Sequence, residues 1–182
     1  KIVLYITLEM AEEIIAERVD ANLMDVTIDD LHAMPKDMYE SKMSKLQKKT
    51  VGKLIIKEYP TASAHSGHFR ALLNELSLKK TFKPDVVFID YLNICASSRF
   101  KGGNISSYFY IKAIAEELRG LAVEFDMPIF SATQTTRSGF TSTDIGLEDT
   151  AESFGLPATA DFMFALYLLQ IQLEQMQLEH EK

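Results

Sequence analysis

The sequence predicts an α/β fold with a mostly parallel sheet and helices on both of its faces. Three apolar stretches, rich in β-branched and aromatic residues, indicate strands that are covered on both sides. Helical patterns alternate with these stretches, which is the arrangement of βαβ units. Each stretch also runs directly into one polar residue, and these residues are Glu9, Asp90 and Gln134. In open α/β sheets the ligand crevice lies at the carboxyl ends of the strands, so we expect the three side chains to share a site.

The first strand covers residues 5–9 and is followed by three helical segments. Residues 11–23 carry an apolar stripe opposite an acidic one, which predicts an amphipathic helix. Thr27 suits the cap of a short helical turn. Pro35 suits the first position of a further helix that runs to about Lys48, and few apolar residues in that helix indicate a peripheral place.

The middle of the chain predicts two strands separated by a helix. Residues 54–59 form a β-branched run that Pro60 ends. Residues 66–78 carry phenylalanine and leucine at helical spacing. A Lys-Pro pair at positions 83–84 then breaks the chain before the strand that ends at Asp90.

The last third predicts a basic loop, a long helix and two strands. Residues 97–107 form the loop, and residues 107–125 have the strongest helical periodicity of the chain. Pro128 opens the strand that ends at Gln134. A polar stretch, a short helix over 148–154 and a final strand over 161–169 complete the prediction.

Composition limits the classes of function. The chain has 182 residues with 47% hydrophobic and 25% charged content, which is typical of one globular domain. A net charge of -7 argues against a broad basic surface for nucleic acid, although local phosphate contacts remain compatible with it. Cys95 is the single cysteine and is expected to be a packed thiol. Because no apolar run reaches the length of a membrane span, we expect a cytoplasmic protein, in the host cytoplasm if it comes from a phage.

Two carboxylates at neighbouring strand ends suit the hydrolysis of a nucleoside triphosphate. Asp90 could hold Mg²⁺ through its waters, and Glu9 could orient or deprotonate the attacking water. Gln134 could sense or polarise a γ-phosphate. The alternative is that Glu9 and Asp90 only cap the turns or helices that follow them.

The sequence has no phosphate-binding loop of the form G-x-x-x-x-G-K-[ST]. The only Gly-Lys pair is Gly52-Lys53, where Gln47 replaces the first glycine and Leu54 follows the lysine. In a P-loop ATPase this motif would precede the first strand seen here. Lys1 also leads at once into a strand, and the residues after 169 fit no sheet or turn, so we expect the chain to be part of a longer protein, truncated at both ends.

Several other polar residues could bind ligands. His65 and His68 have a spacing that suits a metal, but a solvated helix start is the more common use of such a pair. Arg99 and Lys101 in the basic loop could contact a nucleic-acid backbone, or the loop could simply be solvated. Arg137 follows Gln134 closely and leaves the same edge of the sheet.

Four motifs in this order resemble those of the DnaB-type hexameric replicative DNA helicases. The resemblance covers residues 1–169 and is greatest to the replicative helicases of T-even-like phages. LYITLEM at 4–10 resembles the strand with the catalytic glutamate, and FIDYL at 88–92 resembles the Walker B strand, which ends Asp-Tyr-Leu. SATQTTRS at 131–138 resembles the glutamine motif with its following arginine, and residues 149–161 resemble the final loop and strand.

This resemblance implies a RecA-like P-loop NTPase core that uses ATP and Mg²⁺. It further implies a ring of six identical subunits around single-stranded DNA, with a primase and a helicase loader as further partners. Glu9 would activate water, Asp90 would position Mg²⁺, and Gln134 would couple the γ-phosphate to the DNA-binding loops. The residues implied to contact DNA are those of the two loops and the final motif: Arg99, Lys101, Arg137, Ser153 and Gly155. In that motif Ala151 and Phe154 stand where the family usually has Arg and Gly.

We accordingly divide the chain into a partial RecA-like ATPase domain, residues 1–169, and a helical or disordered tail, residues 170–182. The expected function is that of the motor of an ATP-dependent replicative helicase, with negligible ATP hydrolysis by this polypeptide alone. Two alternatives stay open. One is a RecA-like ATPase of recombination or signalling, and the other is a non-catalytic interaction module on the same fold.

Overall fold

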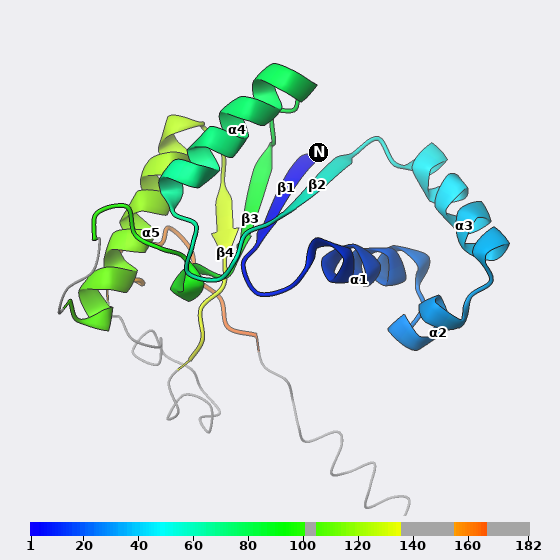
Figure 1. Ribbon diagram of the computed structural model, residues 1–182, viewed down its shortest axis with the longest axis horizontal. Helices are drawn as coiled ribbons and strands as arrows, with labels where there is room; N and C mark the ends of the chain where they lie inside the picture. Colours follow the sequence, from blue (N-terminus) through cyan, green and yellow to red (C-terminus); the bar gives the residue numbers. More distant parts are fainter. Residues whose placement is uncertain (101–104, 136–154, 167–182) are drawn as a thin grey trace, which may run out of the picture.

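The computed structural model describes residues 1–100, 105–135 and 155–166 and contains a four-stranded parallel sheet. The strands are β1 (Ile2–Thr7), β2 (Lys53–Glu58), β3 (Val86–Asp90) and β4 (Ile129–Ser131). Their order across the sheet is β2-β1-β3-β4, with every neighbouring pair parallel. The predicted parallel α/β fold is therefore confirmed (Figure 1).

The helices match the predicted amphipathic segments to within one or two residues at most ends. Thr27 caps α2 as predicted, because its side chain accepts a hydrogen bond from the Asp30 backbone N–H at 3.0 Å. Pro35 differs slightly from the prediction, since it lies at the cap before α3 rather than inside the helix. The bounds are α1 (Glu12–Met24), α2 (Ile28–Ala33), α3 (Lys36–Lys49), α4 (Ser66–Lys80), the short 3₁₀ helix η1 (Leu92–Ile94) and α5 (Ser107–Glu124).

The core lies between one face of the sheet and the helices α4 and α5. Alternate residues of β1 and β3 point into it, as the period of two in a strand requires. Figure 1 shows α4 and α5 together on one side of the strands, with α1, α2 and α3 away from them. The most deeply buried large side chains of this core are Leu4, Ile6, Leu8, Phe69, Val87, Ile89, Ile114 and Leu121.

The other face of the sheet is aromatic and only partly covered. Phe88 stacks between Tyr5 and Phe130, with ring centroids 6.2 Å and 5.2 Å apart, and Phe130 is 45% exposed. Helix α1 approaches this face, where Ile15 and Val19 line a small apolar pocket together with sheet residues. Helices thus pack on both faces of the sheet, but more completely on the face of α4 and α5.

Two predictions for the last third differ from the structure. Strand β4 ends at Ser131, so Gln134 lies three residues beyond the strand. Residues 161–166 form no strand, and Phe162, Phe164 and Leu166 are exposed. Their alternating pattern would need a neighbouring strand edge, and none of the described strands pairs with them. The predicted helix 148–154, residues 167–169 of the predicted strand and the tail 170–182 lie outside the described residues.

No helix within the described ranges is both long enough and apolar enough to span a membrane.

Candidate functional site

The parallel register brings the ends of β1, β3 and β4 to one edge of the sheet. Thr7 is opposite Asp90, and Ile89 is opposite Ser131. The register continues past the strands, since the Leu8 N–H donates to the Asp90 carbonyl at 2.8 Å and the Leu92 N–H donates to the Ala132 carbonyl at 3.2 Å. Glu9 and Gln134 follow these paired positions within two residues, and Asp90 is itself one of them. All three predicted residues therefore lie at the same edge.

Asp90 is held by a tyrosine on the neighbouring strand. The Tyr5 hydroxyl donates to Asp90 Oδ2 at 2.8 Å. Burial of the phenol, together with this carboxylate, raises the pKa of Tyr5, so the hydroxyl remains a proton donor at physiological pH. Sequence reasoning missed Tyr5. The β1–β3 register, in which Tyr5 is opposite Phe88 and Thr7 is opposite Asp90, places Tyr5 and Asp90 on the same face of the sheet.

Gln134 is connected to the residue that follows Asp90. Its Nε2 donates to the Tyr91 hydroxyl at 3.3 Å, and the Gln134 side chain is otherwise exposed. Tyr91 thus lies between the end of β3 and the segment after β4. Its role was also missed, although it directly follows the predicted aspartate.

Glu9 is exposed and does not cap the helix that follows it. The turn after β1 is made by Thr7, whose Oγ1 donates to the Met10 carbonyl at 2.8 Å and accepts from the Met10 N–H at 3.0 Å. The N-cap of α1 is Ala11 and that of η1 is Tyr91, and neither residue makes a side-chain cap hydrogen bond; at the start of α1 the Glu12 N–H donates to Glu58 Oε2 at 3.2 Å and not to Glu9. The structure therefore does not support the alternative in which Glu9 and Asp90 serve only as helix caps.

The edge offers one oriented carboxylate and one exposed carboxylate rather than a closed metal cage. Within residues 1–100, 105–135 and 155–166, no three His, Cys, Asp or Glu side chains form a metal-binding group. Mg²⁺ is commonly held by one or two carboxylates together with water and substrate phosphates. The residues at this edge suit such a phosphate-dependent site better than a permanent all-protein site.

A comparison with known families shows which class of protein has this arrangement of residues at the edge of the sheet. The model of the family described as DnaB-like helicase C terminal domain matches residues 1–181 of this chain. This chain belongs to the DnaB-like helicase C-terminal domain family.

A curated relative agrees with the family. The DnaB-like replicative helicase of Enterobacteria phage T4 is 50% identical over 168 residues, which are 90% of this chain and 35% of that protein. The chain thus spans about a third of that relative's length.

The two structures support the fold. One is a solved ATPase domain, which has a TM-score of 0.71 at 20% identity, with 88% of this chain and 57% of that one covered. The other is the structure of a DnaB-like replicative helicase and its interactions with primase. It has a TM-score of 0.69 at 21% identity, with 88% of this chain and 39% of that chain covered. These likenesses confirm the RecA-like helicase fold expected from the sequence.

Two of the five residues predicted to contact DNA converge on helix α5 of this helicase-family fold. Arg99 forms an ion pair with Glu116. Gly155 is buried against Lys112, and a Cβ added to it would lie 2.9 Å from the lysine stem. Lys112 in turn lies 3.9 Å from the carboxylate of Glu116. Lys101, Arg137 and Ser153 lie outside the described residues.

Glu117 anchors the start of the basic loop and was not predicted. Its carboxylate accepts hydrogen bonds from Ser97 Oγ at 2.6 Å, Ser66 Oγ at 2.7 Å and the Ser98 N–H at 3.0 Å. Partial burial alone would raise the pKa of Glu117, but these hydrogen bonds outweigh it and lower the pKa to about 2. Helix α5 therefore holds the segment that leads from Asp90 to Arg99.

The remaining candidate residues have structural roles. His65 and His68 form a capping box at the start of α4, with His65 Nδ1 accepting from the Gly67 N–H at 3.0 Å and His68 Nδ1 accepting from the His65 N–H at 3.2 Å. Cys95 is buried, and burial raises its pKa to about 12, which confirms a packed thiol. Lys53 is the first residue of strand β2. The Gly52-Lys53 pair therefore leads into a strand, whereas a phosphate-binding loop leads into a helix.

Proposed function

We propose that this chain is the motor part of an ATP-dependent replicative DNA helicase, which couples ATP hydrolysis to movement along single-stranded DNA and to duplex unwinding. One observation carries the proposal: Asp90 ends β3, and Glu9 and Gln134 lie two and three residues beyond the ends of the adjacent parallel strands β1 and β4, at the same edge of the sheet. The family match and the 50% identity to a replicative helicase support the same activity.

Each of the three residues has a chemical task in this proposal. Glu9, exposed just beyond the end of β1, orients or deprotonates the water that attacks the γ-phosphate. Asp90, fixed by Tyr5, places its carboxylate for the metal. Gln134 donates toward the γ-phosphate and, through the segment that follows it, couples the state of the nucleotide to the DNA-binding loops.

Mg²⁺ fits this donor set. Asp90 supplies a hard oxygen ligand of known orientation, which Mg²⁺ prefers, and the nucleotide and water would complete the coordination. When bound, the ion would neutralise charge that develops on the phosphoryl group. Tyr5 would act indirectly, because its hydroxyl restricts how the Asp90 carboxylate can rotate.

The proposed partners follow the helicase activity. They are ATP, single-stranded DNA and identical subunits in a hexameric ring, with a primase and a loader as further partners. One structural neighbour is a helicase described with its interactions with primase, which supports that part of the proposal. An acidic chain is compatible with DNA binding in a ring, since only a few inward loops need to be basic. The proposed location is the cytoplasm.

A chimera tests the proposal directly. This chain would replace the matching segment of the phage T4 relative, and unwinding of forked DNA and ATP hydrolysis would be measured together. Glu9→Gln should lower ATP hydrolysis about 100-fold or more, because it removes the base. Glu13→Gln, which changes an exposed glutamate in the first turn of α1, is the matched control and should leave the rate unchanged. Equal rates for the two variants would refute the role of Glu9.

The same chimera separates the alternatives. A RecA-like ATPase of recombination or signalling would hydrolyse ATP without unwinding a fork, and an interaction module would do neither. The family match favours the helicase over both.

A further inference from the structure

The turn that carries Glu9 is held on both sides of that residue. On one side the Leu8 N–H donates to the Asp90 carbonyl at 2.8 Å, and Leu8 is buried. On the other side Met10 is tied back to Thr7, whose hydroxyl donates to the Met10 carbonyl and accepts from the Met10 N–H. Thr7 is itself completely buried. Glu9 is therefore an exposed residue between two fixed neighbours, and its position depends on the contacts that hold them.

Thr61 supplies a further contact to this turn from outside β1 and β3. It belongs to the β2–α4 connection, residues 59–65, which begins beside the carboxyl end of β1. Its Oγ1 donates to the Leu8 carbonyl at 2.6 Å, across 53 positions of the sequence. This carbonyl is part of the peptide unit that joins Leu8 to Glu9. Because that unit is planar, a hydrogen bond to its oxygen also restricts the backbone from which the Glu9 side chain extends.

The β2–α4 connection is itself anchored to the segment that follows Asp90. The Ala62 N–H donates to the Ile94 carbonyl at 2.9 Å, and the Ala64 carbonyl accepts from the Ala96 N–H at 2.7 Å. Ala62 has a φ of 58°, which is uncommon outside glycine. Such a conformation persists where the surrounding contacts determine the backbone. The hydroxyl donor to Leu8 is therefore carried by a fixed stretch of chain.

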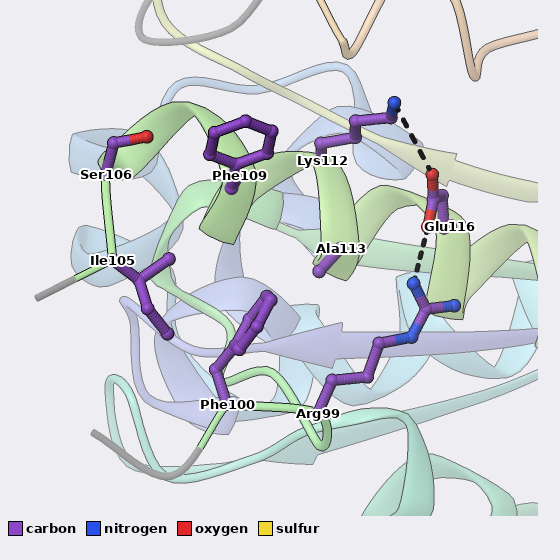
Figure 2. A pocket seen from close by; sticks show the side chains of 8 residues that line it. All are labelled: Arg99, Phe100, Ile105, Ser106, Phe109, Lys112, Ala113 and Glu116. Atoms are coloured by element: carbon purple, nitrogen blue, oxygen red, sulfur yellow. Dashed lines mark hydrogen bonds and ion pairs between the residues drawn. The ribbon is translucent and has the colours of Figure 1, made fainter. Parts of the chain in front are cut away.

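Helix α5 holds both sides of this arrangement. The Ser66 hydroxyl, directly after the connection, donates to the Glu117 carboxylate at 2.7 Å. The segment that follows Asp90 continues to Arg99, which forms an ion pair with Glu116 on the same helix (Figure 2). The connection and the segment bonded to it are thus both attached to one rigid element, which keeps the donor aligned with the turn after β1.

We propose that Thr61 is a positioning residue for Glu9, whose hydroxyl holds the turn in the orientation from which the Glu9 carboxylate reaches the attacking water. The inference rests on the proposed function, in which Glu9 orients or deprotonates that water. Thr61 touches no substrate and acts only through the Leu8 carbonyl. A general base must lie within hydrogen-bond distance of the proton it accepts, and a displacement of about 1 Å can lower a rate about 100-fold. A single hydrogen bond to the turn is therefore enough to change the rate.

Three variants of the chimera test this role. Thr61→Val removes the hydroxyl but keeps the branched shape, and it should lower kcat for ATP hydrolysis about tenfold while leaving the KM for ATP unchanged. Thr61→Ser keeps the hydroxyl and should retain most of the rate. Ser63→Ala is the matched control, since the Ser63 hydroxyl lies in the same connection but donates to the Pro60 carbonyl within it. Its kcat should equal that of the unchanged chimera.

A double-variant cycle separates positioning from a general structural fault. Because Thr61→Val acts through Glu9, adding it to Glu9→Gln should lower the remaining rate by less than about twofold. A fault that spread through the nucleotide site would lower the rate by the same factor in both backgrounds. Equal factors would overturn the proposal, and so would a Thr61→Ser variant that is as slow as Thr61→Val.

Hydrogen exchange in the 182-residue chain tests the same contact without ATP. The Leu8 and Met10 N–H groups should exchange about tenfold faster in Thr61→Val than in the wild-type chain, and Ser63→Ala should leave both unchanged. Unchanged exchange in Thr61→Val would overturn the proposal even if kcat fell. Faster exchange with an unchanged kcat would overturn it as well, because the turn would be loosened without an effect on hydrolysis. A chimera that hydrolyses no ATP would instead refute the proposed function, and exchange would still decide whether Thr61 holds the turn.

Discussion

Glu117 provides the sharpest stability prediction, because three short hydrogen bonds meet on one half-buried carboxylate. Its donors include Ser66 and Ser97, which are both only 6% exposed. Glu117→Gln keeps the shape of the side chain but replaces an acceptor oxygen with an NH₂ group that faces donors. Glu117→Ala removes all acceptors and leaves both serine hydroxyls buried without this partner.

The magnitude follows from the pKa of this carboxyl. The pKa of Glu117 falls from 4.5 to about 2 in the folded chain, and at 1.36 kcal/mol per unit this corresponds to about 3.4 kcal/mol. Because the group is only half-buried, solvent screening reduces this to about 1.5–2 kcal/mol. We expect Glu117→Gln to lower the free energy of unfolding by that amount at neutral pH. The alanine variant should lose about 2–4 kcal/mol, since two buried hydroxyls also lose their partner.

The pH dependence has a definite sign. A carboxyl whose pKa is lowered on folding stabilises the native state above its unfolded pKa, and this contribution disappears as the pH falls toward the folded pKa. For Glu117 the stabilisation is complete above about pH 5 and fades between about pH 5 and pH 2. The difference between the wild-type chain and Glu117→Gln should therefore shrink over this interval.

Urea unfolding at several pH values measures this difference. Glu124→Gln is a suitable control, because Glu124 is on the same helix and has an exposed partner in Arg70. Its effect should be much smaller. A Glu117→Gln variant that matches Glu124→Gln in stability, or a difference that stays constant from neutral pH to about pH 3, would refute the reasoning.

Three further predictions concern single residues. Tyr5→Phe in the chimera should raise the Mg²⁺ concentration needed for half-maximal ATP hydrolysis about tenfold, because Asp90 loses the hydroxyl that orients it; an unchanged Mg²⁺ titration would contradict this. Phe69→Ala should lower the free energy of unfolding by about 3–5 kcal/mol in urea titrations, since Phe69 is fully buried between the sheet and the helices. Cys95 should react with a thiol reagent at mildly alkaline pH only after denaturation, because burial excludes the reagent and raises the thiol pKa to about 12; rapid reaction of the native chain would contradict it.

Much of the fold could be predicted from the sequence because its signals are local. The periodic apolar stripe over 107–125 predicted a helix, and α5 spans Ser107–Glu124. The shared edge of Glu9, Asp90 and Gln134 was also predictable. It requires only that adjacent strands are parallel, since the carboxyl ends of such strands meet on one side.

The residues that sequence reasoning missed act through contacts that are distant along the chain. Tyr5 and Asp90 are 85 residues apart, and Tyr91 and Gln134 are 43 apart, so no local pattern pairs them. Each pair depends on which strands become neighbours and on their register, and a shift of one residue would turn Tyr5 to the opposite face of the sheet. The roles of such second residues can be derived only after the strand order is known.

The predicted strand over 161–169 shows the opposite error, in which a local signal was given too much weight. Phe162, Phe164 and Leu166 alternate as in a half-buried strand, yet they are 80%, 66% and 88% exposed. The chain just before them is held on α5 instead, because Arg119 donates to the Thr159 carbonyl at 2.7 Å and forms an ion pair with Asp161 at 2.7 Å. Alternation states which side chains would share a face, but a strand also needs an edge that can accept its hydrogen bonds. The ion pair with α5 fixes where this segment begins, and the position of a partner edge decides whether it becomes a strand.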